Sequence, residues 1–267
     1  MLPLTKTPPR WLGVGAALLG AVAAAHAATP PPDPADVPAP RSDHGSELAH
    51  LALVQKAARG DVDIYFEGDS ITRRWDAEEP AYRNLRENWT ENFSGWKVSD
   101  FGWGADKLQN ILWRLDHGEL DGVHPQVFVL LAGTNNVGEI PQTGTAAEET
   151  AAVTKGLAAI LRRLQAKAPH ATIVLVGLFP RGDEAAEPKM AAINAINAEL
   201  ARWADGKQLR YLNLNDQLTD ASGQIRPEMF NPDRLHPTVK AYQIWADRLK
   251  PIFAEVVGPP ARPAAAQ

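Results

Sequence analysis

Short apolar runs rich in β-branched residues alternate along the chain with longer segments of helical periodicity. The apolar runs predict strands at residues 64–66, 97–101, 127–131, 172–178 and 209–214. The helical spacing predicts helices near residues 44–58, 106–116, 146–167, 187–204 and 238–254. This alternation implies right-handed crossovers and a parallel sheet with helices on both faces. The pattern therefore predicts a doubly wound, three-layer α/β/α domain whose functional site lies at the carboxyl ends of the strands.

The predicted helix near 106–116 has a clear apolar face. Four apolar residues recur on it at spacings of three and four: Leu108, Ile111, Leu112 and Leu115. Gly118 is placed to end the helix. We expect this face to pack in the core.

The first 27 residues have the pattern of a secretory signal peptide. Lys6 and Arg10 precede an uncharged apolar stretch over residues 11–25, and residues 25–27 read Ala-His-Ala, a small-x-small cleavage pattern. The alternative is an uncleaved anchor, which the short apolar run disfavours because a membrane span needs about 20 residues. Both interpretations predict export to the periplasm or the extracellular space. Without this segment, we expect no membrane span.

Proline-rich composition marks the other boundaries. Residues 28–42 are rich in Pro and Ala, which predicts an extended linker because proline lacks the amide donor that helices and sheets require. Residues 258–267 have the same composition, and we expect a disordered tail. The folded domain is therefore predicted to span residues 43–257.

Composition and charge exclude several classes of function. Hydrophobic residues make up 45% of the chain and charged residues 22%, as in globular proteins. The net charge of −5 offers no electrostatic footprint for nucleic acid. The absence of cysteine excludes disulfides, thiolate nucleophiles, Cys-ligated zinc and a lipoprotein anchor. The nucleophile of any covalent mechanism must then be oxygen or nitrogen.

Unusual polar residues follow the predicted strands. Ser70 follows the first strand, and Asp233 and His236 open the last helix. A serine hydroxyl becomes a nucleophile when an imidazole takes its proton and a carboxylate fixes the imidazole tautomer. We expect the Asp233 carboxylate to raise the pKa of His236 by stabilising the imidazolium.

Two further loops offer donors for the oxyanion that such a serine would create. Residues 102–106 form a glycine-containing loop after the second strand, and residues 133–136 follow the third strand. An oxyanion needs preorganised hydrogen-bond donors. Ser70, Ala105 and Asn135 are the candidate donors.

These segments together resemble the SGNH, or GDSL-type, hydrolases. Four segments match the family's blocks in order across the folded domain: Gly68-Asp69-Ser70-Ile71, Gly102-Trp103-Gly104-Ala105-Asp106, Gly133-Thr134-Asn135-Asn136 and Asp233-x-x-His236. Residues 111–115, 118–120 and 177–182 further resemble the branch that contains the catalytic subunits of intracellular platelet-activating-factor acetylhydrolase. The resemblance implies a flavodoxin-like fold with Ser70 as nucleophile, His236 as base, Asp233 as its orienting carboxylate and Asn135 as an oxyanion donor.

The second block departs from the family pattern. Ala105 stands where the family has its glycine donor, with Gly104 just before it. The backbone amide survives this change, but alanine tolerates a positive φ less well than glycine. Trp103, Gly104 and Asn136 are candidates for the substrate pocket. For Trp103, an acyl-pocket wall and ordinary packing both remain open.

The sequence therefore predicts an exported serine esterase that needs no metal or cofactor. No histidine pair has metal-ligand spacing. From the resemblance we expect a small-molecule substrate with a short acyl group, such as acetyl, on a sugar, a lysophospholipid or a small alcohol. The alternatives are a lysophospholipase or thioesterase, or a non-catalytic secreted carbohydrate-binding module on the same fold. The sequence makes no prediction of the oligomeric state.

Overall fold

The computed structural model describes residues 34–138, 145–182 and 188–261, so the predicted signal segment lies outside the described residues. The described chain contains five parallel strands: β1 (Ile64–Gly68), β2 (Val98–Asp100), β3 (Val127–Leu131), β4 (Thr172–Val176) and β5 (Leu209–Leu212). Their order in the sheet is β2-β1-β3-β4-β5. This order is that of a flavodoxin-like doubly wound sheet, and it confirms the predicted fold class.

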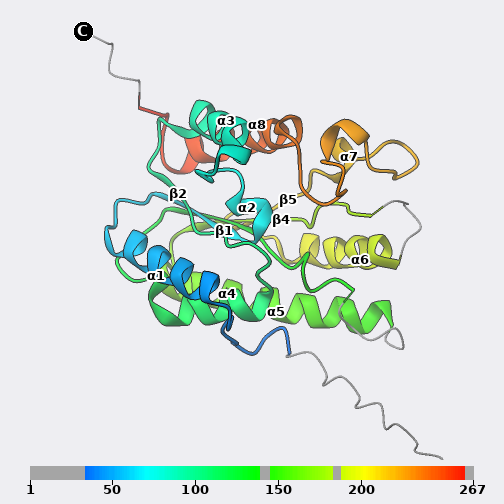
Figure 1. The fold of residues 1–267 in the computed structure, drawn as a ribbon, viewed down its shortest axis with the longest axis horizontal. Coiled ribbons are helices and arrows are strands. Elements are labelled where there is room, and N and C mark those ends of the chain that lie inside the picture. The colour runs from blue at the N-terminus through cyan, green and yellow to red at the C-terminus, as the bar shows by residue number, and fades with distance from the viewer. Residues whose placement is uncertain (1–33, 139–144, 183–187, 262–267) are drawn as a thin grey trace, which may run out of the picture. The chain divides into compact units, whose positions relative to one another are not determined.

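Helices cover both faces of the sheet (Figure 1). One face carries α1 (His44–Ala58), α4 (Leu108–Arg114), α5 (Ala146–Lys167) and α6 (Pro188–Trp203). The opposite face carries α2 (Ser70–Arg73), α3 (Arg83–Phe93), α7 (Asn215–Leu218) and α8 (Val239–Val256). Short 3-10 turns occupy Pro80–Tyr82 and Pro227–Met229, and a π turn occupies Leu115–Glu119. No helix in the described ranges is long and apolar enough to cross a bilayer.

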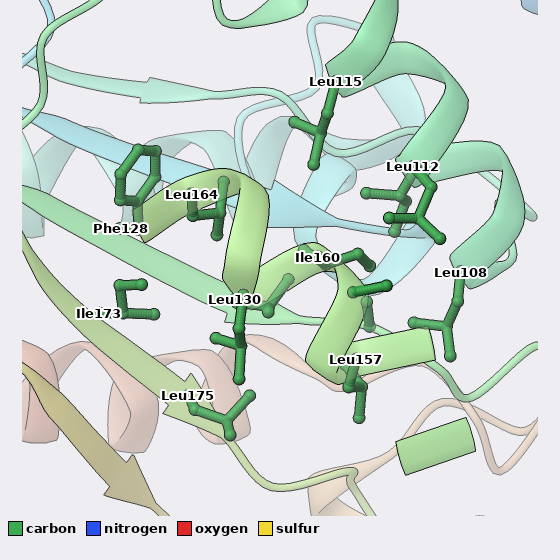
Figure 2. Close-up of a cluster of buried hydrophobic side chains, with 14 of the residues drawn as sticks. Leu108, Leu112, Leu115, Phe128, Leu130, Leu157, Ile160, Leu164, Ile173 and Leu175 are labelled. Carbon is green, nitrogen blue, oxygen red and sulfur yellow. The ribbon is translucent and has the colours of Figure 1, made fainter. Parts of the chain in front are cut away.

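Alternate residues of β1, β3, β4 and β5 supply two cores. On one face, Phe128, Leu130 and Leu175 pack with apolar residues of α4 and α5 (Figure 2). The expected apolar face of α4 is there, since its residues are fully or almost fully buried: Leu108, Ile111, Leu112 and, just after the helix, Leu115. On the other face, Phe66 lies at the centre of an aromatic cluster with Trp75, just after α2, and with residues of α3 and α8: Trp89, Phe93, Trp245 and Phe253.

Several details differ from the sequence prediction. Helix α3 was not predicted, because its apolar positions, Leu85, Trp89 and Phe93, form a narrow stripe within an otherwise polar segment. Helix α4 begins two residues later than expected and passes into the π turn, in which Gly118 adopts φ +99°. The fourth strand ends at Val176 and the fifth at Leu212, each two residues before its predicted end.

The last part of the predicted linker contacts the domain. We call residues 34–43 the N-terminal arm. Ala39 exchanges two hydrogen bonds with α4, donating to Gln109 O at 3.0 Å and accepting from Asn110 Nδ2 at 3.0 Å. Ala35 is buried against α5, where a Cβ at Gly156 would lie 2.7 Å from Ala35 O. The glycine thus permits a close approach of the arm to α5.

Candidate active site

Ser70 lies at a tight turn at the carboxyl end of β1. Asp69 caps α2 by accepting a hydrogen bond from Ile71 N at 2.9 Å, and Ser70 is the first residue of that helix. A Cβ at Gly68 would lie 2.3 Å from Leu131 O on β3, so only glycine lets the chain turn this close to the sheet. Burial raises the pKa of Asp69 to about 7.

The fold brings Ser70, His236 and Asp233 into one hydrogen-bonded chain. Ser70 Oγ lies 2.9 Å from His236 Nε2, although 166 residues separate the two in sequence. His236 Nδ1 lies 2.7 Å from Asp233 Oδ2. The other carboxylate oxygen of Asp233 accepts from the backbone N–H groups of Leu235 and His236, at 3.1 and 3.0 Å. These backbone bonds fix the carboxylate relative to the imidazole.

The expectation that Asp233 raises the pKa of His236 above its ordinary value is wrong. Burial is the largest influence and lowers the pKa of His236, which outweighs the raising effect of Asp233. The positive charges of Arg74 and Arg181 lower this pKa further. For Asp233, burial acts to raise the pKa, but hydrogen bonds from the backbone and ring of His236 outweigh it and hold the pKa below its usual value. The imidazole is therefore neutral at pH 7.

The loop over residues 102–106 lies against the Ser70 turn. Trp103 N donates to Gly68 O at 3.1 Å, which fixes the loop beside the end of β1. Ala105 adopts φ +63°, the left-handed region, so alanine does take the conformation that glycine would favour. Asn135 Nδ2 donates to Asp106 O at 2.8 Å, and the same nitrogen carries a second N–H. The structure thus ties two of the predicted donor positions together through Asp106.

The three candidate pocket residues have different surroundings. Trp103 is half-buried, with its indole N–H donating to Ser46 Oγ at 3.1 Å and the Arg73 guanidinium 4.6 Å from its ring centre. Gly104 presents its carbonyl to Arg41 Nη1 at 3.2 Å. Asn136 is buried, and its side-chain oxygen accepts from Leu108 N at the start of α4, 2.9 Å away. The side chains of Trp103 and Asn136 therefore form hydrogen bonds within the protein that hold the surrounding structure in place.

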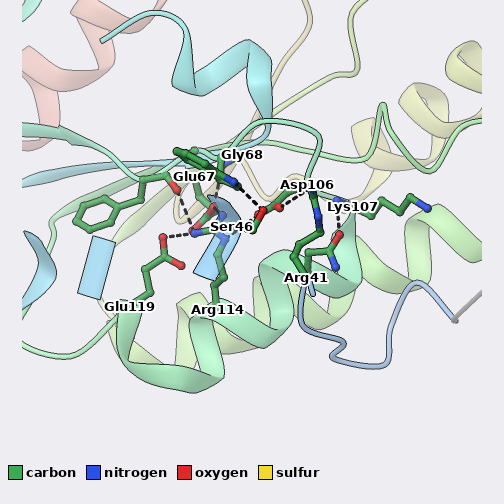
Figure 3. Close-up of polar contacts among 12 residues, drawn as sticks. Arg41, Ser46, Glu67, Gly68, Asp106, Lys107, Arg114 and Glu119 are labelled. Carbon is green, nitrogen blue, oxygen red and sulfur yellow. Dashed lines mark hydrogen bonds and ion pairs between the residues drawn. The ribbon is translucent and has the colours of Figure 1, made fainter. Parts of the chain in front are cut away.

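A buried ionic cluster lies beneath the loop (Figure 3). Arg114 donates from Nε to Asp106 Oδ2 at 2.7 Å, from Nη2 to Glu67 Oε1 at 2.8 Å, and from Nη1 to Glu119. All three carboxylates are fully buried. Burial raises the pKa of each of them, that of Glu67 to about 7 and that of Glu119 well above its ordinary range. The cluster joins β1, the loop, α4 and the π turn, because Glu67, Asp106, Arg114 and Glu119 come from these four segments in turn.

Arg74 and Arg114 are site residues that the sequence interpretation did not single out for a role. Arg74 Nη1 lies 3.9 Å from Asp233 Oδ2, and its spacing of four residues after Ser70, one helical turn, was the available signal. Arg114 stands in a segment that carried the family resemblance, but nothing in the sequence showed which carboxylates it would meet. Within the described ranges, no group of three or more His, Asp or Glu side chains is arranged to hold a metal ion.

Sequence comparisons place this geometry in a known context. The model of the GDSL-like lipase/acylhydrolase family matches residues 66–244. Platelet-activating factor acetylhydrolase IB subunit alpha2 of Gallus gallus is 31% identical over 197 residues, which cover 72% of this chain and 76% of the relative. Subunit alpha1 of Bos taurus is 32% identical over 154 residues, so the match covers 56% of this chain and only 59% of that relative's length.

Solved structures share the fold. A GDSL-like lipase from Bacteroides thetaiotaomicron superposes with a TM-score of 0.56 at 18% sequence identity. The superposition covers 78% of this chain and 95% of the lipase. At this level of identity the likeness supports the fold alone.

Proposed function

The chain belongs to the GDSL-like lipase/acylhydrolase family, a family of carboxylic ester hydrolases, and we propose that it is a serine esterase that removes short acyl groups through an acyl-enzyme on Ser70. One observation carries the proposal. Ser70 Oγ, the His236 ring and the Asp233 carboxylate form a continuous hydrogen-bonded chain, with distances of 2.9 and 2.7 Å. In this chain of contacts the imidazole can take the serine proton and the carboxylate orients the imidazole, which is how a serine hydroxyl becomes a nucleophile in a catalytic triad.

Each side chain then has a role in acylation. Asp233 Oδ2 accepts the Nδ1 proton of His236, which leaves Nε2 free to accept the hydroxyl proton of Ser70. As Oγ attacks the carbonyl carbon of the ester, His236 takes that proton and the Asp233 carboxylate stabilises the imidazolium. His236 returns the proton to the departing alcohol oxygen. A water molecule, deprotonated by the same imidazole, then releases the acid and restores Ser70.

The tetrahedral intermediate places a negative charge on the former carbonyl oxygen. We assign its stabilisation to the backbone N–H groups of Ser70 and Ala105 and to the second N–H of Asn135 Nδ2. Donors of this kind contribute roughly 3–4 kcal/mol each in mutational tests. The bond from Asn135 to Asp106 O supports this assignment because it orients the amide and the loop relative to each other.

Acetyl and other short acyl groups are the proposed substrates. The similarity to subunits named platelet-activating factor acetylhydrolase supports an acetyl ester.

A series of p-nitrophenyl esters from acetate to palmitate tests the acyl preference. We expect kcat/KM to be highest for acetate to butyrate and to fall at least tenfold by octanoate. A maximum at octanoate or longer would contradict the short-chain proposal. A fluorophosphonate probe tests the mechanism separately, because an unreactive Ser70 would favour the non-catalytic binding module on the same fold.

We further propose that the protein is exported. The support is the sequence pattern alone, with its positive, apolar and small-x-small segments ahead of Ala28. The intact mass of protein recovered from the periplasm or medium should match a chain that starts at Ala28. Full-length protein in the cytosolic fraction, with none exported, would contradict this proposal.

A further inference from the structure

We propose that Arg41, on the N-terminal arm, is a positioning residue for the loop over residues 102–106. It holds this loop in the conformation that aims the Ala105 N–H at the substrate carbonyl oxygen. This inference rests on the proposed function. It assigns a role in the reaction to a segment that the sequence predicts to be a linker, and that lies outside residues 66–244, the part of the chain that the family model matches.

Arg41 contacts the loop next to Asp106 (Figure 3). Its Nη1 donates to Gly104 O at 3.2 Å and lies 3.5 Å from Asp106 Oδ1, so one nitrogen meets the residues on both sides of Ala105. The rest of the guanidinium is held by Asp43, which accepts from Nε at 3.0 Å and pairs with Nη2 at 2.8 Å. Asp43 therefore fixes the orientation of the guanidinium whose Nη1 contacts the loop.

The start of α1 adds a second contact with the loop. Asp43 caps α1 by accepting from Ser46 N at 2.9 Å, and Ser46 Oγ donates to the same carboxylate at 2.9 Å. Ser46 Oγ in turn accepts the indole N–H of Trp103 at 3.1 Å. One carboxylate thus organises both contacts, that of Arg41 with Gly104 and Asp106 and that of Ser46 with Trp103.

Asp106 is held from two sides. Arg114, in the buried cluster, binds its Oδ2 from beneath, and Arg41 approaches its Oδ1 from the arm. Ala105 lies between these anchors and the Trp103 contact, and its backbone is in the left-handed region at φ +63°. A non-glycine residue there costs about 1–2 kcal/mol, and such strain persists only where the surroundings determine the conformation. The Ala105 side chain is exposed, so its own packing contributes little to that constraint.

The position of Arg41 explains why the arm matters for rate rather than for substrate affinity. Arg41 binds the carbonyl of Gly104, the residue directly before the donor N–H, and its side chain keeps about 30% of its surface exposed. Loss of this contact leaves the buried core intact but lets the peptide of Ala105 relax from its strained conformation. A misdirected donor weakens transition-state binding more than ground-state binding.

The test compares Arg41→Ala and Arg41→Lys in the full chain with Arg163→Ala. Arg163 is the matched control, because its side chain is 28% exposed and pairs with Asp116 away from the loop. Four quantities are measured for each variant: kcat and KM for p-nitrophenyl acetate, the rate constant of labelling by a fluorophosphonate, hydrogen exchange of peptides spanning residues 101–107, and Tm. Phosphonate labelling is included because attack of the serine on phosphorus builds negative charge on the phosphoryl oxygen, and fluoride then leaves with a tetrahedral phosphonate ester on Ser70.

For Arg41→Ala we expect kcat and the labelling rate to fall about tenfold with KM within twofold of the parent, and exchange over 101–107 to accelerate. We expect Arg41→Lys to be intermediate, because lysine keeps the charge near Asp106 but lacks the fork that spans Asp43 and Gly104. Arg163→Ala should match the parent in kcat and in exchange at the loop.

Two results overturn the proposal. One is an Arg41→Ala variant with parental kcat and labelling rate, whatever its Tm. The other is an equal loss of kcat in Arg163→Ala, which would indicate a general effect of charge or stability. Failure of the proposed function is distinguishable from both, because Ser70→Ala would then retain hydrolysis in an otherwise unmodified chain.

Discussion

Arg74 reaches the same carboxylate oxygen of Asp233 that binds the imidazole, with its Nη1 3.9 Å from Oδ2. The guanidinium therefore competes with the imidazolium for one negative charge. Together with burial and Arg181, it keeps the pKa of His236 below its ordinary value, so the base remains neutral into the mildly acidic range.

The first prediction concerns the pH dependence of kcat/KM. A general base must be neutral, so the acid limb should have its midpoint below the ordinary histidine value of about 6.5. In Arg74→Gln, loss of a positive charge should raise the pKa of His236 and move the limb to higher pH. In Asp233→Asn, loss of the negative charge should move the limb to lower pH and reduce the rate by several orders of magnitude.

Arg73→Gln is the control for Arg74→Gln, because Arg73 pairs with Glu79 and stacks on Trp103 instead of approaching Asp233. Its acid limb should coincide with that of the parent. An unshifted limb in Arg74→Gln would show that the guanidinium does not act on the imidazole.

The second prediction concerns the strained Ala105. Ala105→Gly removes a Cβ cost of about 1–2 kcal/mol at positive φ. Glycine loses more backbone entropy on folding than alanine, which offsets roughly 0.5–1 kcal/mol of that gain. The variant should therefore be more stable than the parent by roughly 0.5–1 kcal/mol in urea unfolding. Gly104→Ala is the control, since its backbone is not in the left-handed region and a Cβ there meets nothing within 4 Å. Destabilisation of Ala105→Gly by 1 kcal/mol or more would argue against strain at this residue.

The third prediction concerns the buried cluster of Arg114. Arg114→Met leaves three buried carboxyl groups without their cation, and it should lower the free energy of unfolding by about 3–5 kcal/mol. Glu119→Gln should cost less than about 1 kcal/mol, because burial raises the pKa of Glu119 and so favours the neutral acid, which glutamine resembles. Chemical denaturation at pH 7 compares the two. Equal losses would mean that Glu119 is ionised in the folded protein.

The fourth prediction concerns stability against pH. Burial raises the pKa of Asp100 to about 7 from an ordinary value of 3.8, so the folded state binds more protons than the unfolded state between these values. The stability linked to Asp100 is complete below about pH 4 and is lost as the pH rises through 7. Asp100→Asn keeps an acceptor for Gly102 N but cannot ionise.

The measured quantity is the difference in urea midpoint between Asp100→Asn and the parent at pH 5.5, 7 and 8.5. The variant should gain stability relative to the parent as the pH rises. A difference that is constant with pH would mean that Asp100 does not titrate in this range.

Local patterns predicted much of this molecule. Each predicted strand and helix exists. The patterns that predicted them, such as β-branched runs and the apolar face of α4, depend only on residues close together in sequence. Helix α3 escaped prediction because its stability comes from Trp89 and Phe93 packing around Phe66, contacts that no local pattern shows. The short sequence blocks that contain Ser70, Asp233 and His236 pointed to these three residues, and the fold brings them together.

Long-range contacts account for what the sequence did not show. Arg41 lies 63 residues before Gly104, in a proline-rich segment whose composition indicates only an extended chain. The lowered pKa of His236 depends on burial and on Arg74 and Arg181, neither of which lies near it in sequence. Charge balance at a site is a property of the folded molecule, so the neighbouring Asp233 alone predicted the wrong direction.

The most direct test of the account is hydrolysis of p-nitrophenyl acetate by Ser70→Ala. Without the Oγ that lies 2.9 Å from His236 Nε2, no acyl-enzyme can form, and only the oxyanion donors and substrate binding remain. We predict that kcat/KM falls by about three orders of magnitude or more, with unchanged Tm and no fluorophosphonate adduct on the variant. A folded Ser70→Ala protein that hydrolyses the ester within tenfold of the parent rate would contradict the mechanism.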